Sequence, residues 1–204
     1  MPAFVGVLTR GFVSSQWALA LRNLALPTGS VIRMVDGLPF DHARNSIVTE
    51  MMKTHSDWLL FIDDDVIPPP DTFGRLTSHR REIVSALCYR RRGKITPAMF
   101  REANPIHYPV ESYSPGELLE VDLVGAGCLA VHRNVFEKLD PPWFEWLIDR
   151  EDLPLSERVG EDLAFARKAR HAGFGIFVDT SVACLHVGLG RSDTDGRFLP
   201  LEAP

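Results

Sequence analysis

Apolar positions follow two different rhythms along the first half of the chain. Short, nearly continuous apolar runs, typical of strands, are separated by segments in which apolar residues recur every three or four positions, as in helices. The order strand, helix, strand, helix indicates parallel strands joined by crossover helices, so we predict an α/β fold. The expected strands are residues 3–8, 31–35, 58–62 and 82–89, and the expected helices begin at the caps Ser14 or Ser15 and Asp41, and at Pro70.

The second half of the chain is less regular. Prolines are frequent between residues 93 and 118, so this stretch is expected to be loop or short strands. Residues 121–131 are largely apolar, and a helix that begins at Gly160 is expected to end before Gly173. The other expected elements are a helix over 133–139, strands near 175–178 and 182–186, and a tail over 191–204.

Composition narrows the class of protein. The chain has 204 residues, of which 45% are apolar and 24% charged, so it can bury a core as one soluble domain, and fibrous or disordered classes are excluded. A net charge of −5 gives no general attraction to nucleic acid or anionic membranes. The local exception is the basic run Arg90-Arg91-Arg92 with Lys94, either a solvated loop edge or a surface for an anionic acceptor.

The spacing of the cysteines and the lengths of the apolar runs indicate the cellular compartment of the protein. Cys88, Cys128 and Cys184 are widely spaced and form no CxxC pair, so neither a disulfide framework nor a zinc site is indicated. The apolar N-terminus has no basic region before it, and no run of about 18 apolar residues occurs. We therefore expect a soluble, cytoplasmic protein.

Three adjacent carboxylates, Asp63, Asp64 and Asp65, follow the wholly apolar strand 58–62. Ligand sites of parallel sheets lie beyond the carboxyl ends of the strands. In an extended chain Asp63 and Asp65 point to the same side, and such a pair offers the oxygen ligands that Mg²⁺ or Mn²⁺ takes when it carries a diphosphate. The alternative is a solvated acidic turn that runs into three prolines.

Three other polar residues have two interpretations each, and a fourth has one. Glu161 and Asp162 lie in the first turn of a helix, where they either pair with the helix dipole or supply a general base. His186 ends an apolar strand as an ordinary histidine or as a neutral ligand. Arg44 opposes the dipole of its helix, which fits a residue that meets a nucleotide or its phosphates.

Taken in order, these segments resemble a GT-A-fold glycosyltransferase close to the family-2 type. The resemblance extends from residue 43 to residue 186. It rests on Ala43-Arg44-Asn45, Trp58 to Asp65 with Pro70-Asp71, Val124 to Val131 with Arg133, Glu161 to Phe165 with Arg167, Ala172 and Gly173, and His186. It implies a Rossmann-like α/β fold with a mainly parallel central sheet flanked by helices.

The resemblance also implies roles for individual residues. It makes Asp162 the catalytic base, with Glu161 beside it, and it gives a Mn²⁺ or Mg²⁺ ion the ligands Asp65, Asp63 and His186. The residues expected at the nucleotide-sugar are Arg44, Asn45, Asp63, Asp64, Gly125, Ala126 and Gly127. Family members often carry paired acids after the second strand, whereas this chain has Asp36-Gly37, so the contacts to the base are left to Thr9, Arg10 and Asp36.

The implied reaction moves a sugar from a UDP- or GDP-sugar to an acceptor hydroxyl, with inversion if Asp162 is the base. Glycan, lipid, protein, metabolite and modified nucleic acid all remain open as acceptors, and so does the oligomeric state. The Q-x-x-R-W motif of polymerising members is absent, so a processive polymerase is not expected. The expected organisation is one domain, 1–204, with a nucleotide-binding half over about 1–92, an acceptor and catalytic half over about 93–190, and the tail.

Other functions share parts of this pattern. A phosphatase of the haloacid dehalogenase type places D-x-D after its first strand, followed by Gly-Thr or Thr, but here Val66-Ile67-Pro68 follow the third strand. A sugar nucleotidyltransferase needs a Gly-rich loop with Arg and Lys after the first strand, for which Thr9-Arg10-Gly11 is a poor match. An inactive nucleotide-sugar binding module is the remaining alternative.

Overall fold

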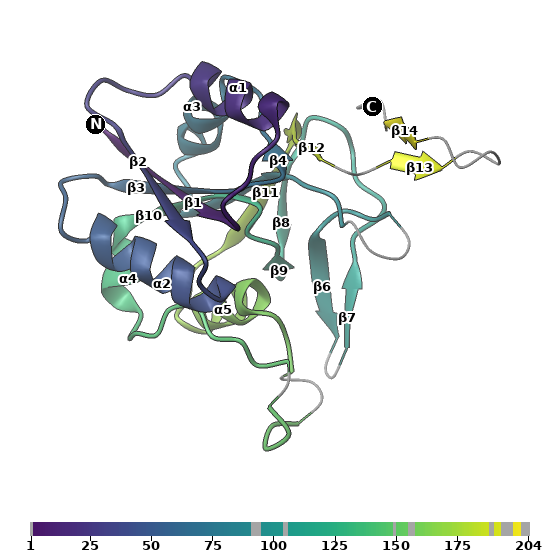
Figure 1. The fold of residues 1–204 in the computed structure, drawn as a ribbon. Helices are drawn as coiled ribbons and strands as arrows, with labels where there is room; N and C mark the ends of the chain where they lie inside the picture. The colour runs from purple at the N-terminus through teal and green to yellow at the C-terminus, as the bar shows by residue number, and fades with distance from the viewer. Residues whose placement is uncertain are drawn as a thin grey trace.

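A large sheet crosses the middle of the molecule, and helices cover both of its faces (Figure 1). The computed structural model describes residues 2–90, 95–103, 106–148, 150–154, 158–187, 190–192 and 198–200. Arg91, Arg92 and Lys94 of the basic run lie outside these ranges. Within them, no helix is both long enough and apolar enough to cross a bilayer.

The sheet has seven strands in the described part of the chain. In spatial order they are β2 (Val31–Asp36), β1 (Ala3–Thr9), β3 (Trp58–Asp63), β10 (Cys128–His132), β5 (Ile83–Leu87), β11 (Ile176–Ala183) and β8 (Leu118–Val121). β10 and β8 run opposite to the other five. The interior of β3 is buried and apolar because the strand is covered on both faces. The predicted α/β class and mainly parallel sheet are confirmed.

Two helical layers enclose two cores. α1 (Ser15–Asn23) and α3 (Thr72–Ser78) lie on one face, with a core that includes Trp17 and Leu76. On the other face, a second core includes Ile47, Phe136 and Phe165, which come from α2 (Phe40–Met51), α4 (Arg133–Lys138) and α5 (Glu161–His171). Figure 1 shows the sheet between these two layers.

Small strand pairs complete the fold. β6 (Met99–Ala103) pairs with β7 (Ile106–Pro109) and β9 (Leu123–Val124), which confirms short strands in the proline-rich stretch and beyond it. β4 (Val66–Ile67) pairs with β12 (Leu185–His186). Within the expected tail, β13 (Gly190–Ser192) pairs with β14 (Phe198–Pro200).

Two boundaries differ from the sequence prediction. Ser14 caps α1 as expected, because its Oγ accepts a 3.1 Å hydrogen bond from the Trp17 amide. Asp41, however, is not the cap of α2: Pro39 occupies that position without a side-chain bond, and Asp41 lies inside the first turn. The expected division into two strands, with a break at residues 179–181, is also wrong. β11 is one continuous strand there, with a register shift in its pairing after Asp179.

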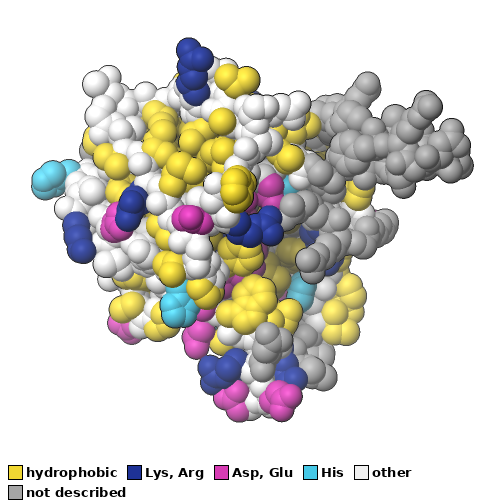
Figure 2. Space-filling model, viewed as in Figure 1, with side chains coloured by type: hydrophobic (Ala, Val, Ile, Leu, Met, Phe, Trp, Pro, Cys, Tyr) yellow, Lys and Arg dark blue, Asp and Glu magenta, His cyan; other side chains and the backbone are white. Residues whose placement is uncertain are grey.

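Apolar side chains remain exposed at one edge of the sheet. β2 is the outermost strand on that side, and its apolar residues Val31 and Ile32 are exposed to solvent. Leu19 of α1 is exposed as well, and Figure 2 shows hydrophobic side chains gathered over this part of the surface.

Candidate active site

The ends of three neighbouring parallel strands bring the first group of predicted residues together. Thr9 ends β1 and pairs in register with Asp36, which ends β2. Arg10 follows β1, and its amide donates a 3.1 Å hydrogen bond to Oδ2 of Asp64, which follows β3. These residues, expected at the nucleotide, therefore share one edge of the sheet.

The β4–β12 pair places Asp65 against His186. His186 pairs with Val66, and the amide of Val187 donates a 2.7 Å hydrogen bond to the carbonyl of Asp65. As a result, Nε2 of His186 lies 3.1 Å from Oδ1 of Asp65, and each side chain is 15% exposed. Residues 121 positions apart in sequence thus form one polar pair.

The chemistry of this pair fits a divalent cation. Nδ1 of His186 lies 2.8 Å from the carbonyl oxygen of Tyr89, which only accepts hydrogen bonds, so this nitrogen carries a proton. In a neutral imidazole, Nε2 then presents its lone pair to the Asp65 carboxylate. Two electron-rich atoms that face each other call for a cation between them, either a proton or a metal ion.

Within the described ranges, no group of three or more His, Cys, Asp or Glu side chains is placed to hold a metal. The third ligand expected from the sequence, Asp63, is engaged elsewhere: its Oδ1 accepts a 2.9 Å hydrogen bond from Nη2 of Arg44. Mg²⁺ usually keeps water and binds substrate phosphates besides one or two carboxylates, so Asp65 and His186 could supply the protein ligands of such a site.

Arg44 lies beneath the site and not in its opening. Only 2% of the residue is exposed. Besides Asp63, it contacts Oε1 of Glu161 at 3.3 Å and the carbonyl of Ala126 at 3.3 Å. The rings of Phe61 and Phe144 lie 5.1 and 5.8 Å from its guanidinium carbon. The sequence placed Arg44 at the nucleotide, but its buried cation joins the end of β3 to the start of α5.

Burial and charge together set the protonation of the two partners of Arg44. Burial raises the pKa of Asp63, and Arg44 offsets only part of that rise. Burial, with the neighbouring Asp162, likewise raises the pKa of Glu161. Without the guanidinium, two carboxylates would lie at low solvent exposure with no cation beside them.

Two glycines lie between Asp162 and Asp63. A β-carbon placed on Gly125 would lie 3.5 Å from Oδ2 of Asp162 and 3.2 Å from Cβ of Ala98. A β-carbon on Gly127 would lie 3.6 Å from Oδ2 of Asp63 and 3.2 Å from Cγ2 of Val66. The stretch Gly125-Ala126-Gly127 therefore runs between the two carboxylates, where side chains would crowd a ligand.

The two acidic residues that begin α5 face different surroundings. Glu161 is 5% exposed and is held by Arg44. Asp162 is half-buried; one oxygen accepts a 2.8 Å hydrogen bond from the amide of Leu163, and the other lies on the side of Gly125. Asp162 is therefore the carboxylate of the pair that faces Gly125, whereas Glu161 is bound to Arg44.

Comparisons with known proteins bear on the fold. No protein-family model matches the chain. It is 26% identical over 136 residues to the mannan polymerase complex subunit mnn9 of Schizosaccharomyces pombe, a match that covers 66% of this chain and 39% of that protein. The crystal structure of A197 from STIV superposes with a TM-score of 0.69 at 16% identity, covering 100% of this chain and 96% of that one.

A third comparison involves a structure with ligands. GalNAc-T7, solved with UDP, GalNAc and Mn²⁺, superposes with a TM-score of 0.64 at 13% identity over 91% of this chain and 44% of that one. The chain has the GT-A glycosyltransferase fold. It spans about two fifths of the length of mnn9. The GT-A fold also removes the structural basis of the haloacid dehalogenase alternative.

In this GT-A fold, Asn45 holds a loop that carries an aromatic cluster of Trp143, Phe144 and Trp146. The Asn45 side chain donates to the carbonyl of Phe144 at 2.7 Å and accepts from the amides of Trp143 and Phe144, so it fixes that loop. Phe144 is buried and stacks on Phe165 at 4.5 Å. Trp146, in contrast, is 41% exposed, so the cluster divides into core and surface members.

Several residues around the GT-A site were not anticipated. The indole of Trp17 donates a 2.8 Å hydrogen bond to the carbonyl of Asp63, and the carbonyl of Tyr89 orients His186. His107 pairs across the β6–β7 hairpin with Glu102, and burial together with the charge of Arg167 lowers its pKa. The helical periodicity around Trp17 indicated burial, but no local signal identified these three partners.

Proposed function

We propose that this chain is a metal-dependent glycosyltransferase that moves a sugar from a nucleoside-diphosphate sugar to an acceptor hydroxyl. The observation that carries the proposal is the buried Arg44, which binds Asp63 of β3 and Glu161 of α5 at once. It fixes the carboxylates at the strand end relative to the acidic first turn of α5, with Gly125 to Gly127 between them. The ligands of GalNAc-T7 in its solved structure support a donor and a cation of this class.

Asp65 and His186 would hold the cation, with Asp63 next to them. A bound Mn²⁺ or Mg²⁺ supplies Lewis-acid stabilisation of the negative charge that develops on the departing nucleoside diphosphate. The Tyr89 carbonyl fixes the tautomer of His186, so that Nε2 faces the ion, a common arrangement for histidine ligands.

The donor would lie along the edge formed by β1, β2 and β3. Thr9, Arg10, Asp36 and Asp64 share that edge, and they would contact the base and the ribose. The sugar would lie along Gly125, Ala126 and Gly127, where the two glycines carry no side chain to crowd it. The nucleotide is UDP or GDP in this proposal.

Asp162 would take the proton of the acceptor hydroxyl. Of the two acids in α5, it faces Gly125, whereas Glu161 is bound to Arg44. Attack from the side of a single base, opposite the departing diphosphate, inverts the configuration of the sugar. General bases placed in this way typically contribute about 10²- to 10⁴-fold to a rate.

A donor screen tests the proposal before the acceptor is known. We expect Mn²⁺ with one of the UDP- or GDP-sugars to raise the unfolding temperature, because a ligand at 100 times its Kd stabilises the folded state by about 2.7 kcal/mol. The same donor should be hydrolysed slowly, with water as acceptor. If no nucleotide-sugar shifts the transition with Mn²⁺ or Mg²⁺, the proposed function is wrong; binding without hydrolysis would instead favour an inactive binding module.

A further inference from the structure

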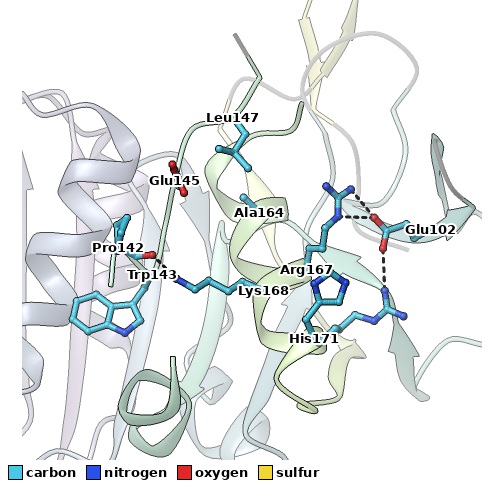
Figure 3. A pocket seen from close by; sticks show the side chains of 10 residues that line it. Glu102, Pro142, Trp143, Glu145, Leu147, Ala164, Arg167, Lys168 and His171 are labelled. Atoms are coloured by element: carbon cyan, nitrogen blue, oxygen red, sulfur yellow. Dashed lines mark hydrogen bonds and ion pairs between the residues drawn. The ribbon is translucent and has the colours of Figure 1, made fainter. Parts of the chain in front are cut away.

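A cavity beside α5 is not explained by the donor site. It has a volume of 630 Å³ and lies between α5, the loop that contains Pro142 to Leu147, and Glu102 of β6 (Figure 3). Its helix residues are Ala164, Arg167, Lys168, Arg170 and His171, on the side of α5 that faces away from the core. Binding sites for small ligands have volumes of about 300–1,000 Å³, so this cavity is of a suitable size.

We propose that this cavity, together with Trp146 at its edge, binds a neutral oligosaccharide that serves as the acceptor. The inference rests on the proposed function, since it assigns the acceptor of that reaction. It names a substrate class, a glycan without charged groups, for which the donor site gives no information.

The first argument is the position of Trp146. A β-carbon placed on Gly160 would lie 3.7 Å from Cζ3 of Trp146 and 3.1 Å from Oδ1 of Asp162. The indole therefore lies beside the first turn of α5, next to the candidate base. Its sequence neighbours Glu145 and Leu147 line the cavity, so Trp146 connects the two places.

The second argument is the charge of the lining. Arg167 and Arg170 both bind Glu102, at 2.7 and 3.1 Å, and Arg170 also contacts Asp122 at 3.0 Å. Lys168 donates to the carbonyl of Pro142 at 2.8 Å and to that of Asp140. Glu102 and Asp122 offset the two arginines, and Glu145 in the same lining offsets Lys168, whose carbonyl partners are uncharged, so the cavity offers little net positive charge to a polyanion. This favours a neutral ligand over a phosphorylated or carboxylated one.

The third argument is that the cavity lining combines polar and apolar side chains. Hydroxyl groups both donate and accept hydrogen bonds, and Glu145, His171 and the arginine pair present both kinds of partner. Trp143 and Leu147 supply apolar surface, on which the less polar face of a sugar ring can pack. The indole N–H of Trp143 is bound to the carbonyls of Phe136 and Leu139, so this ring is held in place.

The fourth argument is reach. Successive residues of an α-helix rise by 1.5 Å, so Lys168 lies about 9 Å along the axis from Asp162. A monosaccharide at Asp162 would reach at most the near end of the cavity at Ala164, whereas a chain of several sugar units that passes Trp146 would extend along it to Lys168. The acceptor is therefore an oligosaccharide and not a free sugar.

Binding measurements test this inference on the intact protein. The probes are four neutral trisaccharides, built of glucose, galactose, mannose and N-acetylglucosamine, titrated by calorimetry and by saturation-transfer NMR. We expect at least one to bind, and trigalacturonate to bind no more tightly. Trp146→Ala and Ala164→Phe, which remove the platform and fill the cavity, should each raise its Kd at least tenfold.

Matched changes on α1 provide the controls. Leu19→Ala truncates another exposed apolar side chain, and Ala18→Phe enlarges an exposed alanine away from the cavity, so both should leave the Kd unchanged. The inference is overturned if no trisaccharide binds, if the anionic one binds more tightly, or if both cavity variants bind like the wild type. Donor hydrolysis by the wild-type protein decides the proposed function separately, because it needs no glycan.

Discussion

Arg44 and Asp63 form a 2.9 Å ion pair in which the side chain of the cation is 3% exposed and that of the carboxylate 30%. The arginine is therefore the buried member, and the aspartate is the partly exposed one. Since Glu161 takes another nitrogen of the same guanidinium, one side chain fixes two acidic segments that are far apart in sequence.

Removal of Arg44 should destabilise the fold strongly. In Arg44→Met, the carboxylates of Asp63 and Glu161 lose their cation at low exposure, and broken buried pairs typically lower the free energy of unfolding by about 3–5 kcal/mol. Arg44→Lys should restore only part of the lost free energy of unfolding, because one ammonium group does not reach both acids equally well. Urea unfolding measures both changes.

The exposed pair Arg33–Glu50 is the matched control for this prediction. It is 2.7 Å long, but its side chains are 49% and 36% exposed. Arg33→Met should therefore change the free energy of unfolding by less than about 1 kcal/mol. Equal effects of the two Met variants would contradict the structural role given to Arg44.

Asp65 and His186 should carry the affinity for the metal. Asp65→Ala or His186→Ala removes one of the two proposed protein ligands, so the affinity for UDP or GDP in the presence of Mn²⁺ should fall at least tenfold. Asp71→Ala changes an exposed aspartate six residues after Asp65 and should leave this nucleotide affinity unchanged. Calorimetric titration makes the comparison, and undiminished affinity in both site variants would contradict the assignment.

Gly127 should be sensitive to a single methyl group. In Gly127→Ala the new carbon meets Val66 at 3.2 Å and points toward Asp63, so we expect weaker binding of the nucleotide-sugar and a stability loss of about 1–3 kcal/mol. Gly74→Ala is the control, because no atom lies within 4 Å of its added carbon and Gly74 is in α3. The free energy of unfolding of Gly74→Ala should rise by up to about 1 kcal/mol. Binding by Gly127→Ala that equals the wild type would show that this space is not used.

Asp179 should contribute stability that depends on pH. Although burial by itself raises its pKa, hydrogen bonds from His79 at 2.8 Å and from the Ser181 amide and hydroxyl lower it below the ordinary value. The ionised carboxylate therefore stabilises the fold above the unfolded pKa of about 3.9, and this contribution is lost as the pH falls through the folded pKa.

Asp179→Asn should accordingly be less stable than the wild type at pH 7, by about 1–3 kcal/mol. The difference should shrink as the pH falls toward 2, where the wild-type carboxyl is increasingly protonated. Denaturant unfolding at the two pH values tests the sign, and a difference that grows at low pH would be the wrong sign for a lowered pKa.

Local patterns predicted the parts of the fold that depend on local rules. Apolar runs located β1, β3 and β5, and the helix signals located α1 and α5, because burial and capping act over a few neighbours. The clustering of Thr9, Asp36 and Asp64 followed from the common edge at which parallel strands end.

Long-range contacts were beyond these rules. The bonds of Arg44 join it to residues 19, 82 and 117 positions away, and nothing near it in sequence shows that its helix turns it inward. The three widely spaced cysteines are likewise all buried, and hydrogen bonds to Cys128 and Cys88, with burial, raise the pKa of the Cys184 thiol well above its ordinary value. Both arrangements depend on the order of strands in the sheet.

The most direct test of the proposed mechanism is donor turnover by Asp162→Asn with Mn²⁺, measured beside its affinity for the nucleoside diphosphate. The substitution keeps the size of the side chain and removes the base, so turnover should fall at least about 100-fold, while nucleotide affinity stays within twofold of the wild type. Turnover near the wild-type rate would contradict the assignment of Asp162 and, with it, the inverting mechanism proposed for this chain.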